Sequence, residues 1–175
     1  MTSHLSEISR VVSNASPLIY FSKIGQLHVL KRLFDEIIIP IQVFREVCST
    51  QDTPDSLVVM SAVNDGWIQS KKIISKDAEL LAESSGIDIG EAAAILLAKD
   101  EHALLLIDDK MGRSAAEMLG VNCLGSVGVL LQSLSDSIID YNKFVFSLDR
   151  MIDLGFRLDS KIYRLIMRMA EQLNQ

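Results

Sequence analysis

The sequence predicts an α/β protein in which a central parallel sheet is covered on both faces by helices. Short aliphatic or β-branched runs alternate along the chain with longer segments of helical spacing, as in parallel sheets joined by right-handed crossovers. The 175 residues are the length of one ordinary domain, and 49% of them are hydrophobic, enough for a full core. We therefore expect one domain, with an α/β part over residues 10–134 and a helical extension over residues 135–175.

The first half of the chain contains three predicted strands, in the segments "RVVSN", "EIIIP" and "WIQSKKI". Four segments between them have helical spacing, namely "SPLIYFSKIG", "QLHVLKRLF", "IQVFREVCS" and "PDSLVVMSAVNDG". Ser16 is placed to cap the first of these helices, Pro17 suits its first turn, and Gly25 ends it. Pro40 stops the second strand and opens the next helix.

The second half continues this alternation and then changes. "KDAELLAESSG", "IDIGEAAAILLAKDE" and "KMGRSAAEMLG" are predicted helices, and "ALLLI" and "VNCLG" are predicted strands. From about Ser135 two helical segments, "DYNKFVFSLDRMIDLGF" and "DSKIYRLIMRMAEQL", follow with no strand between them. We expect them to form a C-terminal helical hairpin that caps the domain or binds a partner.

The last predicted helix carries three cations, Lys161, Arg164 and Arg168, at positions i, i+3 and i+7. They lie opposite the predicted apolar face, which is formed by Ile162, Leu165, Ile166, Met169 and Leu173. Two interpretations remain open: a solvated helix face, or a stripe that contacts phosphates.

Composition excludes several classes of function. His4, His28 and His102 are scattered, as are Cys48 and Cys123, so neither a Cys-rich or His-based zinc site nor a Ser/His/Asp triad is expected. The net charge of −6 argues against coating nucleic acid by bulk electrostatics, but clustered carboxylates that hold metal would also produce it.

The N-terminal segment "MTSHLSEISR" lacks a basic flank followed by an apolar stretch, so we expect no signal peptide. No long apolar segment is free of charge, so we also expect no membrane span. The default location is the cytoplasm.

Acidic side chains follow predicted strands or begin predicted helices. Asp108 and Asp109 end the strand "ALLLI", and Glu46 and Glu91 lie on helices, while Asn14 ends the first strand. In a parallel sheet these positions open on the crevice at the carboxyl ends of the strands. Three or four converging acids repel one another by roughly several kcal/mol unless a cation lies between them. Such a cluster therefore implies Mg²⁺ or Mn²⁺. One or two such ions activate water for phosphodiester hydrolysis without any histidine.

Each acid also has a purely structural interpretation. Asp88 and Glu91 have the spacing of a capping box, and Glu46 resembles a solvated helix acid. Either Asp109 caps the helix that follows and Asp108 is the ligand, or Asp108 caps the helix and Asp109 is the ligand.

A longer pattern resembles a known family. "VVSNASPLIYFSKIGQLHVLKRLFDEIIIPIQVFREV", "GIDIGEAAAILLAKD", "LLLIDDKMGRSAAEMLGV" and "LGSVGVLL" resemble the successive blocks of a PIN-domain branch related to VapC-type toxin ribonucleases. The tail "LDRMIDLGFRLDSKIYRLIMRMAE" is similar to the C-terminal helices of that branch. The resemblance implies a PIN-like three-layer domain that binds Mg²⁺ or Mn²⁺ and cleaves single-stranded RNA. It also implies a homodimer and an antitoxin partner.

Carried over onto this chain, the resemblance assigns catalytic roles to Glu46, Glu91, Asp108 and Asp109. The expected metal ligands are Asn14, Glu46, Glu91, Asp108 and Asp109. The expected RNA-binding residues beside them are Ser16, Lys110 and Arg113.

Asn14 departs from the family pattern, because most PIN nucleases carry Asp at this position. An amide oxygen ligates a hard cation without contributing charge, so weaker metal affinity should follow. This leaves an alternative function, a PIN-like module that binds RNA or protein with little or no catalysis. A phosphoacceptor receiver domain fits poorly, because receivers keep an acid pair after their first strand, where this chain has "SNAS".

Overall fold

The computed structural model describes residues 10–49 and 53–174, and it confirms the predicted α/β fold with its central parallel sheet. The strand order is β3-β2-β1-β4-β5, and every pairing is parallel. The strands are β1 (Val11–Ser13), β2 (Ile37–Pro40), β3 (Ile68–Lys71), β4 (Leu104–Leu106) and β5 (Cys123–Leu124). His4 and the segment in which no signal peptide is expected, residues 1–9, lie outside the described residues.

The two faces of the sheet pack into two different apolar clusters. Val11 contributes to one cluster and Val12 to the other, as expected because successive strand side chains point to opposite faces. Both valines are buried, and so are the alternating residues of β4, Leu105 and Leu106. The sheet is therefore the middle layer of three.

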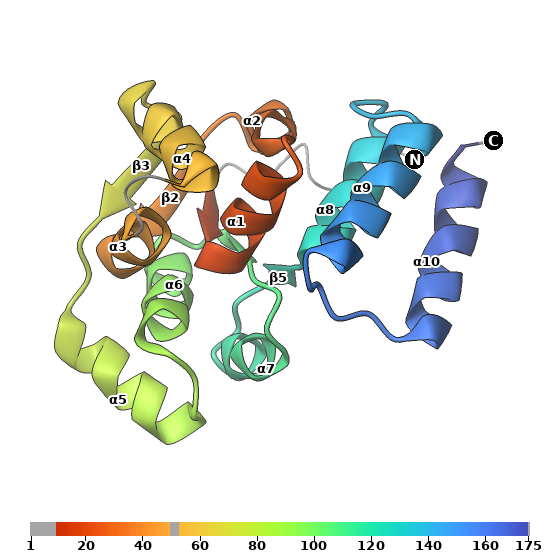
Figure 1. The fold of residues 1–175 in the computed structure, drawn as a ribbon. Coiled ribbons are helices and arrows are strands. Elements are labelled where there is room, and N and C mark those ends of the chain that lie inside the picture. The colour runs from red at the N-terminus through yellow and green to blue at the C-terminus, as the bar shows by residue number, and fades with distance from the viewer. Residues whose placement is uncertain (1–9, 50–52, 175) are drawn as a thin grey trace.

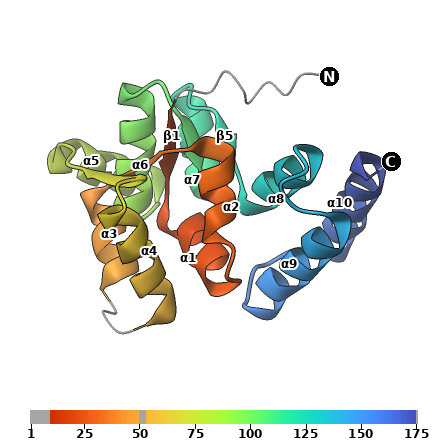
Figure 2. The same cartoon turned by 90° about the horizontal axis from the view of Figure 1, so that it is seen from above.

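Helices form the outer layers (Figure 2). The helices on one face are α1 (Ala15–Lys23), α2 (Leu27–Phe34), α3 (Ile41–Cys48) and α4 (Pro54–Asn64). The helices on the other face are α6 (Ile89–Asp100) and α7 (Lys110–Met118), with α5 (Ser75–Ser85) packed on α6. Gly86 ends α5 in the left-handed conformation with a φ of 65°, which favours glycine.

Three C-terminal helices pack side by side next to α1 and α2 (Figure 1). They are α8 (Ser126–Ser135), α9 (Tyr141–Asp153) and α10 (Ser160–Leu173). The predicted hairpin is α9 with α10, whereas α8 was not predicted. Phe144, Leu148 and Ile166 belong to the same apolar cluster as the inner residues of α1. The C-terminal helices therefore share their core with the α/β part.

A buried polar contact also joins these parts. Gln26, which is 0% exposed, donates a hydrogen bond from Nε2 to Oγ of Ser147 on α9. The Ser147 hydroxyl in turn donates to the carbonyl of Lys143. None of the described helices is both long enough and apolar enough to cross a membrane.

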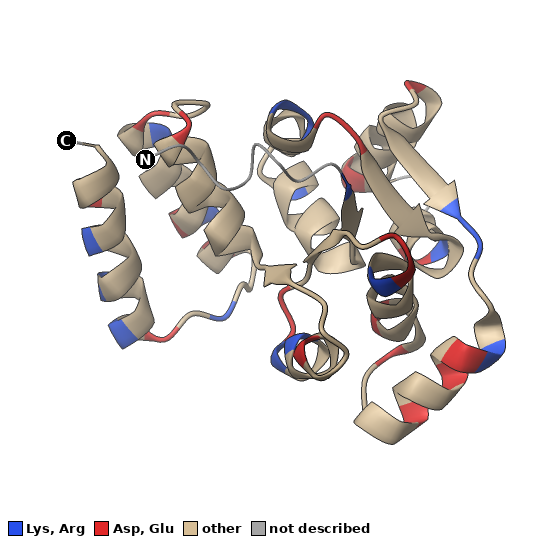
Figure 3. Cartoon of the chain, turned by 180° about the vertical axis from the view of Figure 1, so that it is seen from behind, with Lys and Arg blue, Asp and Glu red and all other residues tan. Residues whose placement is uncertain are grey.

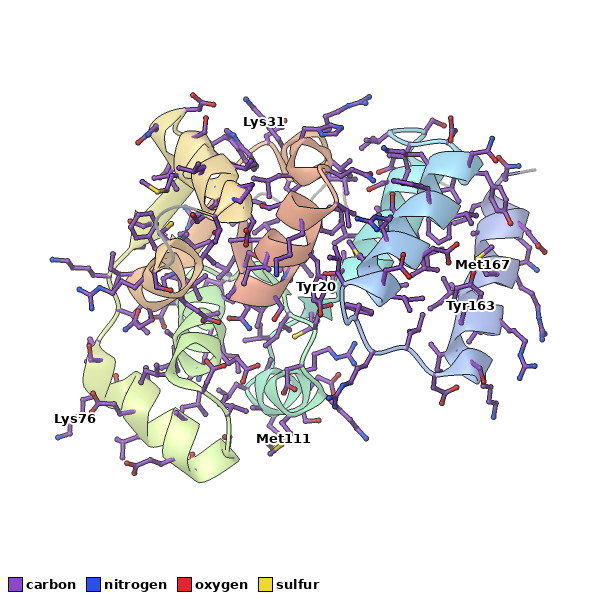
Figure 4. The ribbon with its side chains drawn as sticks, in the orientation of Figure 1. Tyr20, Lys31, Lys76, Met111, Tyr163 and Met167 are labelled. Atoms are coloured by element: carbon purple, nitrogen blue, oxygen red, sulfur yellow. The ribbon has the colours of Figure 1, made fainter. Side chains whose placement is uncertain are left out.

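The apolar face predicted for α10 is wrong. Of its predicted members only Ile166 is buried, and Leu165 is 52% exposed. The inward face also contains Tyr163, Met167 and Ala170, and Figure 4 shows Tyr163 and Met167 on the side toward α9. The helix has apolar residues on two sides, so periodicity alone did not identify the packed side. The cations Lys161, Arg164 and Arg168 are exposed, as both interpretations required.

Candidate functional site

Asn14 lies at the carboxyl end of β1, beside the end of β4. Its backbone N–H donates to the carbonyl of Leu106 over 2.9 Å, which continues the pairing of the two strands. The side chain is 4% exposed, and Oδ1 has no hydrogen-bond partner among the described residues. A buried amide oxygen without a donor is costly, so this atom is available to a ligand.

The expected helix cap at Ser16 is wrong. Because α1 begins at Ala15, Asn14 takes the N-cap position, although its side chain makes no capping hydrogen bond. Ser16 is half-buried in the first turn, directly after the carboxyl end of β1.

Glu91 and Asp88 form the capping box at the start of α6. The Glu91 N–H donates to Oδ1 of Asp88 over 2.7 Å, and the Asp88 N–H donates to Oε2 of Glu91 over 3.2 Å. Glu91 is nevertheless 8% exposed, and it lies near further acids. Capping therefore explains where the Glu91 carboxylate lies, but this carboxylate is buried rather than solvated.

Glu46 on α3 approaches the start of α6. A Cβ added to Gly90 would lie 3.0 Å from Oε2 of Glu46 and 3.2 Å from Oδ1 of Asp88. The absence of a side chain at Gly90 therefore lets these two carboxylates come together.

Asp109 caps α7, as one of the two interpretations proposed. Its Oδ1 accepts a hydrogen bond from the N–H of Gly112 over 2.8 Å. A Cβ on Gly112 would lie 3.6 Å from Cδ of Glu91, so the first turn of α7 packs against the Glu91 carboxylate.

These contacts define an acidic cluster formed by Glu46, Asp88, Glu91 and Asp109, in which Glu91 is buried and the other three acids are exposed. Burial is the largest cause of a rise in the pKa of Glu91 to about 7, and Asp88, Asp109 and Glu46 raise it further. The capping hydrogen bond opposes this rise. Burial and the charge of Asp88 also raise the pKa of Glu46. No described ion pair offsets the negative charge of this cluster.

Asp108 points to different partners. Its two carboxylate oxygens accept hydrogen bonds from the N–H and the hydroxyl of Ser126, each over 2.7 Å. Burial raises the pKa of Asp108, while the Ser126 donors and the charge of Arg113 lower it. Asp108 also lines a groove of about 670 Å³ between α7 and α10, together with Lys110 and Arg113. We call this the Asp108 groove.

Six of the eight predicted site residues fall into two groups. Glu46, Glu91 and Asp109 meet in the acidic cluster, whereas Asp108, Lys110 and Arg113 belong to the groove. Asn14 and Ser16 lie at the end of β1 and belong to neither group. Sequence reasoning treated Asp88 only as a cap, although the sequence places it three residues before Glu91. It missed Ser126, which donates both hydrogen bonds to Asp108, and Tyr20, whose pKa the charge of Asp108 raises, because no spacing rule links either residue to Asp108.

These observations define a class of protein: a three-layer α/β domain with acids at the carboxyl edge of a parallel sheet. A family model described as a PIN domain matches residues 10–172, so the chain belongs to the PIN-domain family. No curated protein matches the chain. Membership in this family supports a function of the nuclease type, and nucleases of this kind generally use divalent metals.

The donors at the site fit a hard divalent cation by their chemistry. Carboxylate oxygens and the buried, unpartnered Oδ1 of Asn14 are ligands that Mg²⁺ and Mn²⁺ accept. Across residues 10–49 and 53–174, however, no three His, Cys, Asp or Glu side chains are arranged to hold one ion. The donors are of the right kind, and one ion could be held by three of them only if their side chains move closer together than they lie in this structure.

Proposed function

We propose that the chain is a metal-dependent endoribonuclease that cleaves single-stranded RNA in the cytoplasm and is related to VapC-type toxins. The observation that carries this proposal is the acidic cluster, in which the buried Glu91 lies beside the exposed acids Glu46, Asp88 and Asp109, and these acids help raise its pKa to about 7. A buried acid among like charges costs stability unless a cation offsets the repulsion, and acids with such perturbed pKa values cluster at functional sites.

The proposed metal ligands are Asn14, Glu46, Glu91, Asp108 and Asp109. A bound Mg²⁺ or Mn²⁺ supplies an activated water and neutralises charge that develops on the phosphate. Asp88 contributes negative charge beside Glu46 and Glu91. Ser126 holds Asp108 in one orientation through its amide and hydroxyl, so this carboxylate is preorganised.

Positive charge beside Asp108 supports RNA as the substrate. Lys110 and Arg113 are exposed in the Asp108 groove, and a guanidinium contacts phosphate oxygens in a bidentate fashion. Ser16, half-buried after β1, is a further proposed RNA contact.

The test is incubation of purified protein with labelled single-stranded RNA in manganese, magnesium or EDTA. We expect cleavage in either metal, none in EDTA, and at least about 100-fold slower cleavage by an Asp108→Asn variant that still melts cooperatively. Equal cleavage in EDTA or by Asp108→Asn would refute the metal-dependent site, since the activity would then come from elsewhere.

A second candidate is a PIN-like module that binds RNA or protein without cleaving. Asn14 favours it, because the site lacks one carboxylate, and so do the hydrogen bonds that occupy Asp108, Asp109 and Glu91. RNA binding in manganese without cleavage identifies this alternative.

The partners follow from the toxin proposal. We propose a homodimer and an antitoxin encoded beside this gene. Light scattering of the purified chain measures its mass in solution, and a monomer at micromolar concentration contradicts the dimer. Co-expression with the adjacent reading frame tests the antitoxin, which should co-purify with the chain and suppress cleavage.

A further inference from the structure

The connection between α9 and α10 brings C-terminal residues to the Asp108 groove. Phe156 and Arg157 from this connection line the groove together with Asp108 and Arg113. Figure 3 shows basic ribbon on α7, on α10 and in this connection. Residues more than forty positions apart in the sequence therefore share one concave surface with a site carboxylate.

Two anchors hold this connection in place. The Phe156 ring packs edge-on against the Tyr20 ring, with centroids 5.2 Å apart, and the Phe156 N–H donates to the carbonyl of Met151 over 2.9 Å. After the connection, Asp159 caps α10 through the N–H of Lys161 over 2.6 Å. Because both ends are fixed, the backbone of Arg157 has a defined position beside the groove.

Tyr20 belongs to the same neighbourhood. It lies on the side of α1 toward the C-terminal helices (Figure 4). Burial is the largest cause of the rise in its pKa, Asp108 raises the pKa further, and Arg157 lowers it. Arg157 and Asp108 therefore both shift the pKa of the Tyr20 phenol. Among the described residues, no hydrogen bond joins Arg157 to Asp108.

The guanidinium groups of this groove form no ion pair within the described chain, although the charge of Arg113 acts favourably on Asp108. The ion pairs among residues 10–49 and 53–174 are Arg10 and Lys71 with Glu101, and Arg150 with Asp153, so neither Arg113 nor Arg157 belongs to one. Lys110 is a third exposed cation of the groove, against the acids Asp108 and Glu117. On a chain of net charge −6, this local excess of positive charge favours an anionic ligand.

We infer that Arg157 binds an RNA phosphate next to the nuclease site, and that the α9–α10 connection forms one wall of the RNA channel. The inference rests on the proposed function, since it names where the RNA strand runs from Asp108. Arg113 and Arg157 each contact a phosphate, and the Phe156 ring gives an unstacked base an aromatic surface. An acidic peptide is the other anionic occupant, but the cations gather beside the carboxylate of the proposed reaction, which favours the nuclease substrate.

The test measures binding of a fluorescent single-stranded RNA by anisotropy in EDTA and in calcium, at several salt concentrations. The proteins are the parent, Arg157→Ala, Arg157→Lys and the matched control Arg150→Ala, an exposed hairpin arginine outside the groove. We expect Arg157→Ala to bind about tenfold more weakly. Its plot of log affinity against log salt should be shallower by about 0.7, the value for one lost phosphate contact to a single strand.

The two remaining variants complete the expectation. Arg157→Lys should keep most of the salt dependence, because it keeps the charge, and Arg150→Ala should match the parent. If Arg157→Ala matches Arg150→Ala, the inference is wrong. It is also wrong if Arg157→Ala binds RNA normally but loses an acidic peptide, such as a poly-glutamate 20-mer, that the parent binds.

Cleavage in manganese by the same proteins separates this inference from the proposed function. Weakened RNA binding by Arg157→Ala, with no cleavage by any protein, supports the channel and refutes the nuclease. Normal cleavage by the parent, with unchanged binding by Arg157→Ala, refutes the channel alone. A parent that binds no RNA in either condition overturns both.

Discussion

Two adjacent carboxylates, Asp108 and Asp109, belong to opposite kinds of environment. Asp109 caps α7 and adds its charge to the acidic cluster, where it helps raise the pKa of Glu91. Asp108 instead receives two donors from Ser126 and the favourable charge of Arg113. The acidic cluster is short of positive charge, whereas the Asp108 groove has an excess of it. Under the proposed function, a divalent cation at the cluster and an RNA phosphate in the groove would offset these two imbalances together.

The largest expected effect separates the two environments through Asp108. Asp108→Asn keeps the size of the side chain and its contact with Ser126 but removes the charge. We expect RNA cleavage in manganese to fall by about 10²- to 10³-fold, the usual cost of losing one group that stabilises charge in an active site. The matched control is Glu79→Gln, an exposed acid on α5, which should cleave like the parent. Equal losses in both variants would mean that net charge, rather than Asp108, controls activity.

The second prediction adds a carboxylate at Asn14. Asn14→Asp should lower the free energy of unfolding in EDTA by about 1–3 kcal/mol, because a buried charge replaces an amide. Manganese should then raise the melting temperature more in the variant than in the parent, since ions bind only the native state. Differential scanning calorimetry with and without manganese measures both effects.

Three further outcomes of the Asn14→Asp experiment are informative. If the variant melts like the parent in EDTA and gains nothing in manganese, Asn14 lies outside the metal site. No melting shift at millimolar manganese in the parent, with none in Asp108→Asn, argues that the acids never form a site. Cleavage that falls in Asn14→Asp would show that the parent functions with an amide ligand.

The third prediction concerns the pH dependence of stability without metal. The pKa of Glu91 is about 7 in the folded protein and near its usual 4.5 in the unfolded chain, so the folded state binds the extra proton between these values. Stability from Glu91 is therefore complete below pH 4.5 and is lost as the pH rises through 7. Urea titrations in EDTA from pH 4 to 8 should show this loss in the parent and much less of it in Glu91→Gln. A loss of the same size in both proteins would assign the pH dependence to another group.

The smallest expected effect is that of Gly90→Ala. The new Cβ would lie 3.0 Å from Oε2 of Glu46, the end of a flexible side chain that can move away, and 3.2 Å from Oδ1 of Asp88, which the capping hydrogen bond holds. The free energy of unfolding should change by less than about 1 kcal/mol, because the helix propensity of alanine offsets the crowding of the cap. The melting shift in manganese should shrink, because Glu46 leaves its neighbours. The same substitution in a Glu46→Gln background should change that shift far less, and an equal change would exclude Glu46 as the cause.

Local sequence patterns predicted much of the fold. The strands and most helices follow from aliphatic runs and helical spacing, and the carboxyl edge of the sheet places Asn14 and Asp108 together. The helix α8 was missed, because its sequence "SVGVLLQSLS" contains a glycine and continues an apolar run. The packed side of α10 was wrong, because a helix with two apolar sides needs a partner to select one.

The sequence predicted which residues lie at individual strand and helix ends, but it did not predict which of these residues contact one another. Capping rules offered Asp109 at α7 and the Asp88–Glu91 box as alternatives to ligand roles, and the structure contains both caps. They did not predict that Asp108 contacts Ser126, which is 18 residues further along the chain. Tyr20 and Arg157 depend on how the C-terminal helices dock, which is a property of tertiary packing rather than of local spacing.

The shared core of the two parts has a consequence for cooperativity. Phe144, Leu148 and Ile166 are buried in the same cluster as the inner face of α1, and Gln26 bonds to Ser147. Truncation before α9 would expose this apolar surface and leave a buried amide without its partner, so a shortened chain should aggregate rather than act as a smaller enzyme. The last two helices are therefore part of the folding unit, so the α9–α10 connection reaches the Asp108 groove only when the whole domain is folded.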